Sequence, residues 1–133
     1  MTARLQDIEV VLADRPGSLA AFGQTLGRAG VSLEGGGVFT IDSQAVAHFL
    51  VDDAARARQA LEAAEIAPVT IHDVIMLRLR QAVPGQLGLL ATRMAQAGVN
   101  IAVQYSDHDH HLVLVVPAEH TTAAHKVAED WTA

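Results

Sequence analysis

The sequence predicts an α+β fold made of two consecutive units, each with its strands and helices in the split βαβ, or ferredoxin-like, order. Three observations support this prediction: an internal repeat, apolar residues at strand spacing before a Pro-Gly pair, and apolar residues at helical spacing after it. We expect the first unit to span residues 1–72 and the second to span residues 73–133. This order of elements implies antiparallel sheets with the helices on one face.

The repeat is clearest around the two Pro-Gly pairs. Asp14-Arg-Pro-Gly-Ser-Leu19 aligns with Ala82-Val-Pro-Gly-Gln-Leu87, and the alignment continues without a gap through the segment that follows. Further along, Phe49–Val51 matches Leu114–Val116 only after a small shift, so one hairpin is shorter in the second copy. Internal self-similarity of this kind indicates that each copy is one structural unit.

The first copy contains every element of the βαββαβ order. In Arg4–Ala13, apolar residues alternate with Asp7 and Glu9, which is the spacing of a strand. After Pro16 an apolar stripe at helical spacing runs to Gly30, which stands where a glycine commonly closes a helix in the left-handed conformation. The remaining predicted elements are a hairpin of Val31–Ile41 and Ala45–Val51, a helix at Ala54–Ala64 and a strand at Pro68–His72.

The glycine run Gly35–Gly37 falls inside the second predicted strand of the first copy. A phosphate-binding loop would precede a helix, so the run indicates a β-bulge or a close backbone approach instead.

The second copy repeats this order but lacks a fourth strand. Its predicted elements are a strand at Val74–Arg80, a helix that ends at Gly98, a hairpin of Val99–Ser106 and His111–Val116, and a helix at Ala118–Trp131. The chain provides no further residues for another strand. Because Leu112–Val116 is apolar on both sides, we expect a second sheet, from the sister copy or from another chain, to cover the face opposite the helices.

Composition excludes several classes of function. The chain has 133 residues, a net charge of -6, a single lysine and no cysteine. It therefore lacks the basic patch that binds nucleic acid or acidic membranes, and it has no thiolate for a metal site or a disulfide. No apolar run is long enough for a transmembrane helix and no signal-peptide core is present, so we expect a cytoplasmic protein.

The two strand-to-helix turns are the best candidates for a binding site. A helix N-terminus presents unpaired N–H groups and the positive end of the helix dipole, and a neighbouring glycine lets a carboxylate approach the backbone. The alternative is that both turns are ordinary helix starts, with Asp14 capping its own helix.

Asp14-Arg-Pro-Gly-Ser-Leu19 followed by Ala29-Gly-Val-Ser-Leu33 resembles the ACT domain family, and so does Val83-Pro-Gly-Gln-Leu87 followed by Ala97-Gly-Val-Asn-Ile101. The stretch Ala97–Tyr105 is similar to the serine-sensing domain of phosphoglycerate dehydrogenase. The resemblance covers nearly the whole chain, as two tandem copies. ACT domains are βαββαβ modules that bind amino acids or other small effectors and regulate metabolic enzymes.

The resemblance implies an amino-acid-binding regulatory protein without enzymatic activity or a cofactor. Its ligand would lie at interfaces between ACT units and change assembly, as in a homodimer, or change binding to a metabolic enzyme or transporter. The turn of one unit and the start of the second strand of a neighbouring unit would supply the contacts, with Asp14 meeting the ligand's ammonium group. The implied site residues are Asp14, Arg15, Gly17, Ser18, Leu19, Ser32 and Leu33 in the first copy, and Val83, Gly85, Gln86, Leu87, Asn100 and Ile101 in the second.

Two alternatives remain open at this stage. The segment Asp107–His111 contains His108, His110 and His111 beside two aspartates, so it is a candidate zinc or nickel site in an ACT-like metal sensor. The same residues also suit a solvated hairpin turn. The second alternative is a protein-docking module that binds no ligand. An enzyme is not expected, because the chain has no nucleophile elbow, paired-carboxylate motif or Walker loop.

Overall fold

The computed structural model describes residues 4–131, and the chain divides into two compact units between Asp73 and Val74. We refer to them as unit 1 and unit 2. None of the helices within residues 4–131 has the length and apolar character needed to cross a membrane.

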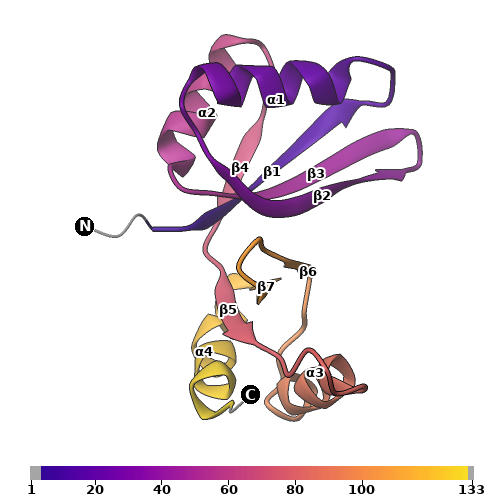
Figure 1. The fold of residues 1–133 in the computed structure, drawn as a ribbon, viewed down its shortest axis with the longest axis vertical. Helices are drawn as coiled ribbons and strands as arrows, with labels where there is room; N and C mark the ends of the chain where they lie inside the picture. The colour runs from indigo at the N-terminus through magenta and orange to yellow at the C-terminus, as the bar shows by residue number, and fades with distance from the viewer. Residues whose placement is uncertain (1–3, 132–133) are drawn as a thin grey trace. The chain divides into compact units, whose positions relative to one another are not determined.

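Unit 1 has the predicted βαββαβ order. Its elements are β1 (Gln6–Ala13), α1 (Ser18–Arg28), β2 (Leu33–Ile41), β3 (Gln44–Val51), α2 (Ala54–Ala63) and β4 (Val69–His72). The sheet order is β2-β3-β1-β4, and all neighbouring strands are antiparallel. Both helices cover the same face of this sheet (Figure 1). The ferredoxin-like fold predicted for the first copy is confirmed.

The core of unit 1 lies between the sheet and its helices. Ile8, Val10 and Leu12 alternate along β1 and are buried against Phe22 and Leu26 of α1. Full burial of an aliphatic or aromatic side chain of this size contributes about 1.5–3 kcal/mol to folding. The alternation that predicted the strand therefore also supplies the inner wall of the core.

Unit 2 has the order βαββα, with three strands among its described residues. Its elements are β5 (Ile75–Arg78), α3 (Gln86–Gln96), β6 (Val103–Ser106), β7 (His111–Val115), the 3-10 turn η1 (Ala118–His120) and α4 (Thr121–Asp130). The sheet order is β5-β7-β6, and both pairings are antiparallel. Leu90 and Met94 of α3 pack in its core with Leu114 of β7 and Ala124 of α4.

Strand β6 is shorter than predicted: it starts at Val103 rather than Val99. The N–H of Asn100 donates to Nδ1 of His120 at 3.1 Å instead of to a partner strand. Just before β6 begins, the N–H of Ala102 donates to the carbonyl of Val115 in β7. A side chain outside the hairpin thus takes the backbone donor that a longer strand would use.

Helices α1, α2 and α3 each end at a residue with positive φ, which is glycine in two of them and glutamate in the third. At the end of α1, Gly30 has φ 73°, and at the end of α3, Gly98 has φ 75°, as predicted. At the end of α2, Glu65 takes the equivalent position with φ 62°. Its N–H donates to Glu62, and the next N–H, of Ile66, reaches back to Leu61, which is the Schellman pattern. A side chain in this conformation costs about 1 kcal/mol relative to glycine.

One position of the glycine run in β2, Gly36, requires glycine. The pairing of β2 with β3 shifts register between Leu33 and Gly35, as predicted for a bulge. Gly36 has φ 133°, and a Cβ atom there would overlap the carbonyl oxygen of His48 and the Cα atom of Phe49. Both are backbone atoms of β3, so no side-chain rotation can relieve the overlap.

Two histidine–carboxylate pairs lie on the face of the unit 1 sheet opposite the helices. Nδ1 of His48 lies 2.8 Å from Oδ2 of Asp7, which is fully buried, and Nε2 of His72 lies 2.7 Å from Oε1 of Glu9. The two imidazole rings stack with their centroids 6.1 Å apart. The hydrogen bond to Asp7 raises the pKa of His48 above its ordinary value of 6.5, and the negative charges of Asp7 and Glu9 add to it, although burial opposes them.

Replacing Gly36 with Ala should destabilise unit 1 by about 2 kcal/mol or more, because β2 and β3 must separate to make room for the methyl group. Gly23→Ala is the matched control. Gly23 lies in α1 with no atom within 4 Å of the added Cβ, so that change should add about 0.5–1 kcal/mol of stability. Urea unfolding of both variants measures the difference. Equal stability of Gly36→Ala and wild type would contradict the close approach.

The raised pKa of His48 predicts a pH dependence of stability. A group whose pKa is higher in the folded state stabilises fully below its unfolded pKa, and this contribution is lost as pH rises through the folded value. The free energy of unfolding of wild type should therefore fall relative to that of His48→Gln as the pH rises above about 6.5, the ordinary pKa of histidine. Urea unfolding across this range gives the difference. A constant difference between the two proteins would show that His48 does not titrate as proposed.

Candidate functional site

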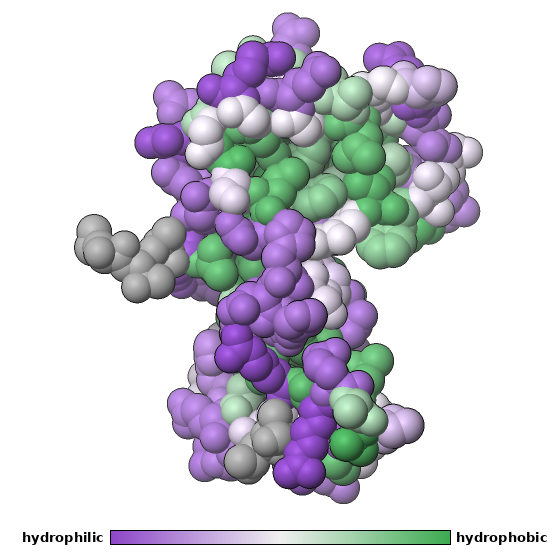
Figure 2. Space-filling model, in the orientation of Figure 1, coloured by the Kyte–Doolittle hydropathy of each residue, from purple (hydrophilic) through white to green (hydrophobic). Residues whose placement is uncertain are grey.

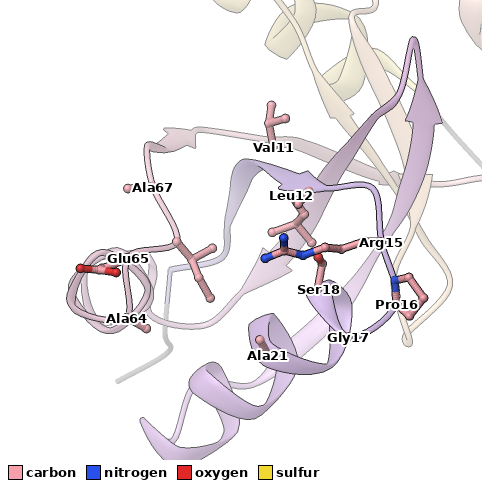
Figure 3. Close-up of a pocket in the computed structure, with 12 residues that line it drawn as sticks. Val11, Leu12, Arg15, Pro16, Gly17, Ser18, Ala21, Ala64, Glu65 and Ala67 are labelled. Carbon is pink, nitrogen blue, oxygen red and sulfur yellow. The ribbon is translucent and has the colours of Figure 1, made fainter.

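A cavity of about 510 Å³ lies beside the turn from β1 to α1 in unit 1 (Figure 3). One wall comes from the end of β1, the turn and the first residues of α1, and the other comes from the loop between α2 and β4. The lining residues are Val11, Leu12, Ala13, Arg15, Pro16, Gly17, Ser18 and Ala21 on the first wall, and Ala64, Glu65, Ile66 and Ala67 on the second. A volume of this size suits a small-molecule ligand.

The sheet order creates this cavity. Strand β4 pairs antiparallel with β1, with Val69 opposite Val10 and Ile71 opposite Ile8. The loop that enters β4 therefore runs beside the end of β1, where the turn to α1 begins. The two walls are distant in sequence, but the pairing of one strand with the other holds them together.

The turn presents the positive end of α1 to this region. Gly17 is the N-cap residue with φ 93°, and no side chain caps the helix. The N–H of Ser18 donates to the carbonyl of Arg15 at 3.3 Å. In a helix that begins at Ser18, the N–H groups of Leu19 and Ala20 have no acceptor within the helix. The turn can therefore receive an anionic group.

The lining contains one cation and one anion, Arg15 and Glu65, one on each wall. Both residues are exposed, and neither forms a salt bridge with another residue in the 4–131 range. Leu12 and Ile66 add apolar surface to the two walls.

Three of the predicted unit 1 residues, Arg15, Gly17 and Ser18, line the cavity together. Asp14 does not line it: its Oδ1 accepts a hydrogen bond from Oγ1 of Thr40 at 3.2 Å. The alternative in which Asp14 caps α1 is wrong, because Gly17 occupies the cap position. Leu19 is also outside the lining and 51% exposed.

Ser32 and Leu33 lie at the opposite end of the same sheet. Leu33 pairs with Val51, and Val51 pairs with Gln6 at the start of β1, whereas the turn follows the end of β1. The length of β1 puts about 23 Å between the two positions. The amide of Ser32 donates to Asp52 at 2.9 Å, and its hydroxyl bonds Glu34 at 2.6 Å. Unit 1 alone does not bring these residues to its turn.

The second predicted turn has the same backbone form. Gly85 is the N-cap of α3 with φ 87°, and no side chain caps this helix either. The side-chain oxygen of Gln86 accepts a hydrogen bond from the N–H of Arg80 at 3.4 Å, and Val83 and Leu87 are each 44% exposed.

Asn100 and Ile101 precede β6, at the other end of the unit 2 sheet. Strand β6 starts with Val103 opposite Val115, whereas β5 ends with Arg78 opposite His111. The turn and the start of the second strand are thus separated within unit 2 as they are within unit 1. A site built from both would need a neighbouring unit.

The histidine-rich segment forms a hairpin turn. Oδ1 of Asp107 accepts hydrogen bonds from the N–H groups of Asp109 at 2.9 Å and His111 at 2.7 Å, and its Oδ2 lies 2.9 Å from Nδ1 of His111. Burial raises the pKa of Asp107, but the hydrogen bonds from His111 and Asp109 outweigh it, so the pKa lies below its ordinary value of 3.8. Within residues 4–131, no group of three or more His, Cys, Asp or Glu residues is arranged to hold a metal ion. The metal alternative at His108, His110 and His111 therefore gains no support.

The second wall of the cavity, Ala64–Ala67, was missed by sequence reasoning. The βαββαβ order contained the necessary signal, because in this order the last strand lies beside the first. The loop before the last strand is then a neighbour of the first strand-to-helix turn. A search for charged residues in that loop would have found Glu65.

Residues 7–68 match the sequence profile of the ACT domain family. This segment covers the βαββα part of unit 1 and both walls of the cavity. Unit 1 is an ACT domain. Its family membership agrees with the resemblance carried by the Asp14–Leu19 motif.

The chain is similar to a number of solved structures, among them the following three. A protein of Bacteroides thetaiotaomicron is 20% identical, with a TM-score of 0.79 over 98% of this chain and 90% of that one. The regulatory subunit of aspartate kinase from Thermus thermophilus is 22% identical, with a TM-score of 0.71 over 96% of this chain and 91% of that one. The corresponding subunit from Thermus flavus is 25% identical, with a TM-score of 0.70 over 96% and 92%. No curated protein sequence matches the chain.

Proposed function

We propose that this protein is an amino-acid-binding regulatory protein with no catalytic activity of its own. The cavity beside the first turn of the ACT domain carries the proposal, because three residues of the family motif, Arg15, Gly17 and Ser18, line it. The similarity to regulatory subunits of aspartate kinase supports a regulatory role. A metabolic enzyme or a transporter would be the protein that responds.

Unit 2 is proposed as a second, truncated ACT unit. Its support is local: the same order of strand, helix, hairpin and helix, an N-cap glycine with positive φ at Gly85, and a helix-closing glycine at Gly98. The similarity of Ala97–Tyr105 to the serine-sensing domain of phosphoglycerate dehydrogenase remains a prediction.

In the proposed mechanism, the ligand's carboxylate binds the uncapped N-terminus of α1 at Gly17–Leu19. The unit 2 turn at Gly85–Leu87 offers a second position where an anionic group can bind. Residues at the start of the second strand, Ser32 with Leu33 or Asn100 with Ile101, complete a site when another unit is adjacent. Pairing of two chains as a homodimer would provide such neighbours. The ligand shifts assembly only to the extent that it binds one assembled state more tightly than the other.

A ligand-free docking module is the second candidate, and exposed apolar residues of unit 1 favour it. Phe39 and Ile41 of the edge strand β2 are 58% and 57% exposed, and Val11 is 44% exposed. Apolar residues gather on the visible face of unit 1 (Figure 2). Exposed apolar surface and an open strand edge are typical of interaction surfaces.

Thermal unfolding with each of the twenty L-amino acids at millimolar concentration tests the proposal. A ligand present at one hundred times its Kd adds about 2.7 kcal/mol to stability, which raises Tm by several degrees. We expect one amino acid, or a few related ones, to produce this rise. A panel without any rise would favour the docking module.

Matched arginine variants show which turn responds. Arg15→Gln changes the turn of unit 1, and Arg80→Gln changes an exposed arginine that precedes the turn of unit 2. We expect the first variant to reduce the ligand-induced rise in Tm and the second to preserve it. The opposite result would place the site at unit 2.

A further inference from the structure

Resting on the function proposed above, we propose that Glu65 and Arg15 together make the cavity of unit 1 selective for zwitterions, with Glu65 holding the α-ammonium group of an amino acid whose side chain is uncharged. Arg15 and the N-terminus of α1 hold the α-carboxylate. The ligand side chain lies against the apolar walls.

The charges of the cavity match the two charged groups of an amino acid. Arg15 extends from the turn toward the Ala64–Ala67 loop (Figure 3), and Glu65 belongs to that loop. The two residues come from opposite walls, and neither has a salt-bridge partner in the described part of the chain. Both are exposed, so their long side chains can adjust to a ligand between them.

Asp14, which the family resemblance implied for the ammonium group, lies outside the lining of this cavity. Its carboxylate accepts the hydroxyl hydrogen bond of Thr40 and does not line the cavity. Glu65 is the one carboxylate among the lining residues. Within this cavity, the carboxylate that can hold the ammonium group therefore comes from the loop rather than from the turn.

The backbone at Glu65 points to a role for its side chain. The equivalent positions after α1 and α3 are Gly30 and Gly98, and all three residues have φ between 62° and 75°. Glycine adopts this conformation without steric cost, whereas glutamate does not. Because Glu65 holds this unfavourable conformation at the wall of the cavity, we infer that its side chain has a function there.

The remaining lining residues determine which class of ligand side chain the cavity can accept. Apart from Arg15 and Glu65, the lining is apolar or small: Val11, Leu12, Ala13, Pro16, Gly17, Ser18, Ala21, Ala64, Ile66 and Ala67. No third charge is present in this set to neutralise a charged ligand side chain. The lining offers no partner for a charged ligand side chain, so amino acids with aliphatic or hydroxyl side chains fit it best.

The test uses calorimetric titration of the full chain with L-alanine, L-valine, L-leucine and L-threonine. Each is compared with its deaminated acid, which lacks the ammonium group, and with its amide, which lacks the carboxylate. We expect wild type to bind at least one of the four amino acids at least about tenfold more tightly than either analogue, since loss of one charge-assisted contact costs about that factor.

Three variants locate the selectivity. Glu65→Gln should weaken binding of that amino acid about tenfold and leave binding of the deaminated acid unchanged. Glu65→Gly should have the same effect on binding while its Tm without ligand equals or exceeds that of wild type. Glu62→Gln is the matched control, because Glu62 lies on α2, pairs with Arg58 at 3.8 Å and does not line the cavity; it should bind as wild type does.

Three results would overturn the inference. If Arg15→Gln loses binding while both Glu65 variants bind the amino acid as wild type does, the proposed function stands but Glu65 holds no ammonium group. If wild type binds none of the four probes but binds a charged amino acid of the full panel, the proposed function again stands and the assignment of an uncharged side chain is wrong. If none of the twenty amino acids binds, the proposed function fails together with the inference.

Discussion

The antiparallel pairing of β4 with β1 is the contact on which the candidate site depends. It places Val69 beside Val10 and thereby brings the end of α2 next to the turn that starts α1. Arg15 and Glu65 are 50 residues apart in the sequence, and this pairing brings the segments that contain them together. The same pairing covers the edge of β1, while β2 remains the open edge of the sheet on the other side. The pairing of β1 with β4 is thus part of the sheet and also holds the two walls of the cavity together.

The elements of both units were predictable because each rests on a local rule. Alternation predicted β1, helical spacing predicted α1 and α3, and the glycines after those helices have the left-handed conformation expected of them. The glycine run of β2 was interpreted as a bulge or a close backbone approach, and both are present: the register shifts between Leu33 and Gly35, and the backbone of β3 leaves no room for a side chain at Gly36. Such features depend on a few neighbouring residues, so the sequence contains the information needed.

The rest depended on contacts between distant segments. Thr40 takes the carboxylate of Asp14, His120 takes the amide of Asn100, and Asp7 becomes a buried partner of His48. Local spacing predicts none of these pairs. Glu65 was missed for a related reason: its importance appears only when the loop that contains it lies beside the turn. The wall that contains Arg15, Gly17 and Ser18 could be predicted from the sequence motif, whereas the wall at Ala64–Ala67 became apparent only from the strand order.

The most direct test of the central claim, that an amino acid binds in the cavity of unit 1, is a map of backbone amide shifts by nuclear magnetic resonance. The ¹⁵N-labelled full chain would be titrated with an equimolar mixture of the twenty L-amino acids. The account predicts that the largest changes fall in Arg15–Ala21 and Ala64–Ala67, the two walls of the cavity. Changes confined to Val83–Leu87 or Asp107–His111, or no changes at all, would contradict it.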